Sequence, residues 1–69
     1  MTKLPSSEKV IRILEAAGFI FKSQKGSHMK YAFGSKIVIL PAKRREIPLG
    51  TLKSISRQSG IAYELFLNL

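Results

Sequence analysis

A chain of 69 residues, 45% of them hydrophobic, is long enough for one small core and too apolar for a charge-rich disordered tail, so we expect a single domain over residues 1–69. The absence of cysteine excludes disulfides, zinc-thiolate sites and thiol nucleophiles, and it is typical of the reducing cytoplasm, where we expect the protein to act. A formal charge of +8 predicts a polyanionic partner; nucleic acid is favoured over a ribosomal or membrane-surface role, although these would require a similar charge.

The first predicted element is a helix over residues 7–17. Apolar residues recur at helical spacing from Val10 to Ala17, Ser6 and Ser7 precede them as N-cap candidates, and Gly18 follows as a stop. The preceding residues 1–8 lack the apolar segment of a signal peptide, and no apolar run approaches the ~20 residues that span a bilayer. We therefore expect no membrane partner.

A change of the apolar period to two predicts three strands in a meander. The first begins at Phe19, the second covers His28–Phe33, and the third covers Lys36–Leu40. A two-residue turn of Gly34 and Ser35 joins the last two. The second strand is expected to direct one set of side chains to the core and the other set away from it, respectively Met29, Tyr31, Phe33 and His28, Lys30, Ala32.

The length of the first hairpin loop follows from the requirement that the apolar side chains of its two strands point to the same face of the sheet. Pairing Phe21 with Met29 leaves residues 24–26 as a three-residue loop, in which Gly26 takes the left-handed position. The same register places Lys22 opposite His28. The predicted structural turn is therefore at Gly26.

The sheet face directed away from the core is expected to be both basic and apolar. Lys22, His28 and Lys30 share this face in the predicted register. It also carries three isoleucines, Ile20, Ile37 and Ile39. Such an open apolar face is unusual for a free monomer, so we expect a partner protein to cover it, with self-association as the alternative.

The remaining chain is predicted to form a basic loop, a helix and a short tail. The loop covers residues 42–48 between two prolines, and its cations form either phosphate contacts or a solvated charge run. A helix is expected from about Gly50 to Gly60, followed by a last helical turn within residues 61–69. The cations of the loop are Lys43, Arg44 and Arg45.

Residue counts exclude most catalytic designs. Four Glu and no Asp cannot easily build a carboxylate cluster for metal ions, and no nucleotide-binding glycine motif is present, so we expect neither metal nor cofactor. His28 remains as the one general acid or base. RNA carries its own nucleophile, the 2'-hydroxyl, so a histidine with nearby cations meets the minimum for cleavage, with Lys30 or Tyr31 as candidates for a second proton-transfer group. On composition alone, a solvated surface histidine is the alternative.

Two stretches, LEAAGFIFKSQKGSHMKY at residues 14–31 and GTLKSISRQSGI at residues 50–61, resemble the HicA toxin family. The Gly-Ser-His element of residues 26–28 is the most specific part. The resemblance implies an α+β fold like that of double-stranded-RNA-binding domains, of order α-β-β-β-α, with the helices on one face of a three-stranded antiparallel sheet. It also implies that His28 is catalytic in messenger-RNA cleavage and that a HicB-type antitoxin blocks the toxin. Many members carry a second histidine shortly after the third-strand proline, where this chain has Ala42, Lys43 and Arg44.

We therefore expect a toxin that cleaves messenger RNA without metal. RNA contacts are expected from Lys22, Lys25, Lys30, Lys43, Arg44 and Arg45. The antitoxin is expected to cover Ile20, His28, Ile37 and Ile39, in a complex that could be oligomeric. A non-catalytic double-stranded-RNA-binding-like module is the alternative. A helix-turn-helix transcription factor is disfavoured, because the would-be recognition helix over residues 62–69 has one acid and no base.

Overall fold

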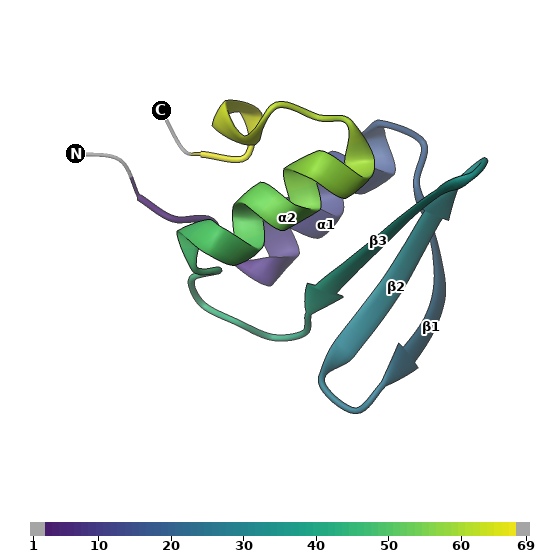
Figure 1. Ribbon diagram of the computed structural model, residues 1–69. Coiled ribbons are helices and arrows are strands. Elements are labelled where there is room, and N and C mark those ends of the chain that lie inside the picture. The colour runs from purple at the N-terminus through teal and green to yellow at the C-terminus, as the bar shows by residue number, and fades with distance from the viewer. Residues whose placement is uncertain (1–2, 68–69) are drawn as a thin grey trace.

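A computed structural model describes residues 3–67, and the order of its elements confirms the predicted α+β fold (Figure 1). The strands form one antiparallel sheet in the order β1-β2-β3. Within residues 3–67, no helix is long and apolar enough to span a bilayer. Residues 1–2 of the N-terminal segment and 68–69 of the predicted tail lie outside the described residues. The elements are α1 (Ser7–Ala16), β1 (Ile20–Lys25), β2 (His28–Phe33), β3 (Lys36–Pro41), α2 (Leu49–Ser59) and the short 3-10 helix η1 (Tyr63–Leu65).

Local sequence signals define the ends of both helices. The Ser6 hydroxyl accepts a hydrogen bond from the Lys9 N–H at 3.1 Å, which satisfies a donor in the first turn of α1. Helix α2 begins after Pro48 and ends at Gly60, whose φ of 79° is the left-handed conformation that glycine adopts without steric cost. Both helices therefore end within a residue of their predicted limits.

The core lies between the helices and one face of the sheet. Figure 1 shows both helices on the same side of the sheet, with α2 beside β3. Ile47 of the loop before α2 and Phe66 after η1 are fully buried in this core. The rest of the buried cluster comes from the helices, the sheet and the residue before β1: Val10, Leu14, Leu52, Ile55, Met29, Tyr31, Val38, Leu40 and Phe19.

The turn between β1 and β2 differs from the predicted one. It has two residues, Gly26 and Ser27, instead of three, and Gly26 has the expected positive φ, of 59°. Lys25 consequently pairs with His28. The predicted pairing of Lys22 with His28 is wrong.

A β-bulge compensates for the shorter turn. With a two-residue turn and a regular ladder, Phe21 would lie opposite an outward residue and point away from the core. The ladder instead skips Lys22 between Phe21 and Ser23, so that Phe21 pairs with the inward Tyr31. The bulge restores the inward direction of Phe21, which packs against the Tyr31 ring but remains 51% exposed. The two-residue turn is what puts Lys25, and not Lys22, opposite the histidine.

The end of the sheet near the second turn is less covered than expected. Phe33, predicted in the core, is 51% exposed and packs against Phe19, with the ring centroids 5.6 Å apart. Ala32 belongs to the outward set yet is buried, since its small side chain lies between its larger cross-strand neighbours Ile20 and Ile37. The apolar alternation therefore predicted the direction of these side chains but not their burial.

The buried Ser7 fixes the start of the basic loop to the N-terminus of α1. Its hydroxyl donates to the Pro41 carbonyl at 2.6 Å and accepts from the Arg44 N–H at 3.0 Å. Its own N–H donates to the Arg44 carbonyl at 3.0 Å. On the other side, the Ala42 N–H donates to the Ser27 carbonyl at 2.6 Å. The loop is thus attached to both the helix and the first hairpin.

We expect the Ser7→Ala change to lower the free energy of unfolding by about 1–3 kcal/mol, because it leaves the Arg44 N–H and the Pro41 carbonyl without their buried partner. Urea denaturation measures the change. The matched control is Ser54→Ala, whose hydroxyl bonds only within its own helix and which should shift the value by less than about 0.5 kcal/mol. Equal stability of the two variants would refute the bridging role of Ser7.

Candidate functional site

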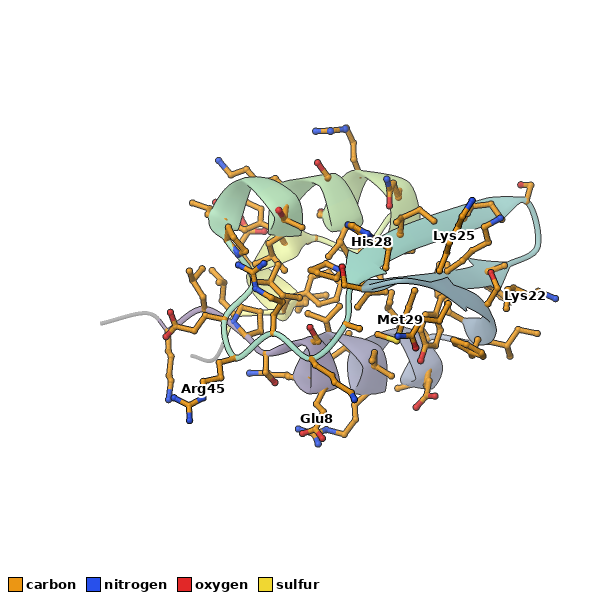
Figure 2. All side chains as sticks on the ribbon, turned by 90° about the horizontal axis from the view of Figure 1, so that it is seen from below. Glu8, Lys22, Lys25, His28, Met29 and Arg45 are labelled. Atoms are coloured by element: carbon orange, nitrogen blue, oxygen red, sulfur yellow. The ribbon has the colours of Figure 1, made fainter. Side chains whose placement is uncertain are left out.

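His28 is exposed on the sheet face that the helices leave open. It is the first residue of β2, and because the next residue, Met29, is buried, alternation directs His28 outward. Its cross-strand neighbours are Lys25 of β1 and Pro41 of β3. Figure 2 shows His28 and Lys25 on one side of the sheet and Met29 on the other, toward α1. The histidine is therefore open to a ligand.

A cavity of about 220 Å³ is lined in part by His28, and we call it the outer hollow. Lys25 lies directly across from the histidine, and Lys30 lies two residues along on the same face. An exposed imidazole can exchange a proton with a bound ligand, while the ammonium groups stabilise negative charge on it. The outer hollow is lined by Ser23, Lys25, His28, Met29, Lys30 and Ile39.

The remaining predicted cations lie elsewhere. Lys22 is the bulge residue and does not line the outer hollow. Lys43, Arg44 and Arg45 follow the strand residue that pairs with His28, but they line hollows beside α1. Lys43 has a φ of 56°, a left-handed conformation uncommon outside glycine and a mark of a tight turn. The predicted cations thus form two groups, Lys25 and Lys30 near His28 and the loop cations beside α1, with Lys22 apart from both.

The three predicted isoleucines share the open face with His28. Ile20, Ile37 and Ile39 are 58%, 44% and 39% exposed, respectively. Ile20 and Ile37 lie on either side of Ala32, and Ile39 pairs with Lys30. A continuous apolar strip therefore borders the basic outer hollow.

Tyr31, the second candidate for proton transfer, lies on the buried face and not beside His28. Burial, and to a lesser extent the carboxylate of Glu15, raises the pKa of the Tyr31 phenol above its ordinary value of 10.0. Lys30, in contrast, shares the face of His28. Among residues 3–67, no three His, Asp or Glu side chains are grouped so that they could hold a metal ion.

A second cavity had no counterpart in the sequence predictions. It has a volume of about 400 Å³, and we call it the inner hollow. It combines the start of α1, the strands β1 and β2 and the basic loop, so no local motif could indicate it. Its lining residues are Ser6, Ser7, Glu8, Ile11, Gln24, Met29, Ala42, Lys43, Arg44 and Arg45.

The described fold agrees with a match to a model of a protein family. A family model described as the HicA toxin of bacterial toxin-antitoxin systems matches residues 7–61. The matched region covers most of the chain and includes both helices and all three strands. A search of curated proteins finds no match.

The raised pKa of Tyr31 predicts a dependence of stability on alkaline pH. In the unfolded chain a tyrosine ionises near pH 10, which is a lower pH than the buried Tyr31 of the folded protein requires. The contribution of Tyr31 to the free energy of unfolding is therefore fully present below about pH 10 and is lost as the pH rises through the pKa of the folded state. We expect Tyr31→Phe to remove this contribution from the unfolding free energy measured between about pH 9 and 12. Tyr63→Phe should retain it, and an unchanged profile in Tyr31→Phe would contradict the assignment.

Proposed function

The chain belongs to the HicA toxin family, and from this membership we propose that it is an endoribonuclease that cleaves messenger RNA without a metal ion, with His28 as a proton-transfer group. As a family member it is a toxin of a toxin-antitoxin system. The observation that supports the proposal most directly is the exposed His28 with Lys25 across from it and Lys30 beside it.

In the proposed reaction, His28 removes the proton from the RNA 2'-hydroxyl or supplies a proton to the leaving oxygen. The 2'-oxygen forms a bond with the adjacent phosphorus, the bond from phosphorus to the 5'-oxygen breaks, and the 5'-oxygen is protonated. Lys25 and Lys30 stabilise the charge that gathers on the phosphate. Lys30 is also the candidate second proton-transfer group, because it lies on the same face as His28. DNA lacks the 2'-hydroxyl and resists this reaction.

RNA binding is proposed to use both groups of cations. Lys25 and Lys30 would hold the phosphates at the reacting bond, and Lys22, farther along β1, would contact the strand away from it. Such contacts neutralise phosphate charge and release counterions, which makes binding dependent on salt. The loop beside α1 contributes the second group, Lys43, Arg44 and Arg45.

The antitoxin of this system is proposed to be a HicB-type protein that covers the open sheet face. The exposed strip of Ile20, Ile37 and Ile39 gives such a partner an apolar surface to bury. Acidic groups of the partner would pair with Lys25 and Lys30, and His28 would be occluded. This arrangement blocks access of RNA and the proton transfer together.

A second candidate function is an RNA-binding module without turnover. The observation that favours it is the loop after Pro41, which has Ala42, Lys43 and Arg44 where many members of the family carry a second histidine. The fold type also serves to bind duplex RNA by its shape and phosphates. In this case the cations would bind RNA and His28 would have no chemical role.

Cleavage of a single-stranded RNA by the purified wild type and by His28→Ala separates the two functions. We expect His28→Ala to cleave roughly 100-fold more slowly or not at all, since a positioned proton-transfer group contributes about that factor or more. EDTA should leave the wild-type rate unchanged. RNA that is bound by the wild type yet remains intact would refute the catalytic proposal and support the binding module.

A pair of lysine variants controls for charge in the same assay. Lys25→Ala and Lys22→Ala remove the same side chain from the same strand, but only Lys25 lies opposite His28. We expect the cleavage rate to fall about tenfold or more in Lys25→Ala and distinctly less in Lys22→Ala. Equal losses would mean that the lysines contribute only general attraction for RNA.

A charge placed in the isoleucine strip should disrupt inhibition by the antitoxin. We expect Ile37→Lys to weaken antitoxin binding at least roughly tenfold, because the new ammonium would be buried in an apolar contact. Isothermal titration calorimetry measures the affinity. Leu65→Lys is the control, since Leu65 is exposed on η1, outside the sheet. Unchanged affinity in Ile37→Lys would place the antitoxin elsewhere.

A further inference from the structure

The inner hollow combines an apolar floor with a charged mouth. Ile11 of α1, Met29 of β2 and Ala42 of the loop provide the apolar lining. Glu8 lies on the first turn of α1, and Gln24 on β1 has its amide held by a hydrogen bond from Nε2 to the Gly26 carbonyl at 3.0 Å. The cations at the mouth are Lys43, Arg44 and Arg45.

We propose that the inner hollow binds an unpaired base of the RNA substrate, a few nucleotides from the cleaved bond, and that Glu8 favours a base carrying an amino group. The proposal rests on the proposed function, because it assigns a specificity subsite to the same RNA strand. It gives this toxin a means of choosing among cleavage sites that His28 itself does not provide.

The size and chemistry of the inner hollow fit a base. Its volume of about 400 Å³ lies within the range of roughly 300–1,000 Å³ that is usual for small-ligand pockets. Apolar side chains suit the faces of a base, and the guanidinium of Arg44 or Arg45 offers a plane for stacking. An unpaired base is also the form in which RNA sequence is ordinarily read.

The charge around the inner hollow favours a nucleic acid over an acidic peptide as the occupant. Arg44 and Arg45 line a further hollow together with Lys3 and Glu46, where the cations outnumber the carboxylate, so positive charge continues beyond the mouth. Lys9 and Arg12 extend them along α1. A run of cations on either side of a base-sized pocket matches a chain in which phosphates alternate with bases.

The position of the inner hollow relative to His28 allows one strand to use both hollows. Met29 lines the inner and the outer hollow, so only the first residues of β2 separate them. At this end of the sheet, the Ala42 N–H bonds to the Ser27 carbonyl at 2.6 Å and joins the loop to the hairpin turn. In Figure 2, Met29 and Glu8 lie on the α1 side of the sheet and His28 on the opposite side. A single strand that crosses this end therefore passes from one hollow to the other.

Glu8 gives the inner hollow a preference among bases. A carboxylate only accepts hydrogen bonds, so it pairs with the amino groups of cytosine, adenine or guanine. Uracil has a carbonyl oxygen where cytosine has its amino group, and its ring N–H is flanked by two carbonyl oxygens that the carboxylate repels. Removal of the charge by Glu8→Gln retains the shape and supplies a donor, which suits uracil.

The test uses His28→Ala protein, in which cleavage is expected to be at least roughly 100-fold slower. The ligands are single-stranded oligonucleotides in which one position at a time is abasic or carries each base in turn. Fluorescence anisotropy measures affinity, and methyl spectra report Ile11, Met29 and Ala42 directly. We expect one position at which an abasic site weakens binding about fivefold or more and abolishes the methyl shifts. At that position uracil should bind more weakly than cytosine.

Glu8→Gln and Glu15→Gln, each combined with His28→Ala, complete the test, since both remove one negative charge from α1. We expect Glu8→Gln to abolish the preference against uracil and Glu15→Gln to retain it. Equal affinity for every base and abasic position, or unmoved pocket methyl signals, would overturn the base site even if the wild type cleaves RNA. Methyl shifts with an acidic peptide and none with RNA would overturn it in favour of a protein ligand.

Discussion

Side chains along a strand point alternately to the two faces of a sheet, and the helices of this protein cover only one of those faces. Strand β2 therefore buries Met29 and Tyr31 and, by the same geometry, exposes His28 and Lys30. A shift of the strand by one residue would bury the histidine and expose the core residues. The register that stabilises the core thus also determines which groups a ligand can reach.

The fold and the outward position of His28 could be predicted from the sequence, because they depend on apolar periodicity and on turn residues such as Gly34. The identity of its cross-strand neighbour could not. The bulge at Lys22 leaves Phe21 inward, so the apolar pattern is the same whether Lys22 or Lys25 lies opposite the histidine. An apolar pattern thus predicts the sheet face on which a side chain lies more securely than its neighbour on the next strand.

The inner hollow and the attachment of the basic loop could not be predicted from the sequence, for a different reason. Ser7 looked like a second N-cap candidate beside Ser6, whereas its hydroxyl bonds to Pro41, which is 34 positions away in the chain. Arg44, in turn, is held by its backbone, and no backbone partner can be recognised from residue type. Contacts between distant segments follow from the packed fold and leave no local signature.

The anchoring of Arg44 also bears on the kinetics of recognition. The loop is held by hydrogen bonds from α1 and from the first hairpin before any ligand arrives, so little conformational entropy is lost when it is engaged. Binding to such a preorganised surface is close to a rigid-body encounter, without coupled folding. For a chain of charge +8 and a polyanion, the encounter rate is then governed by long-range attraction and falls steeply with ionic strength.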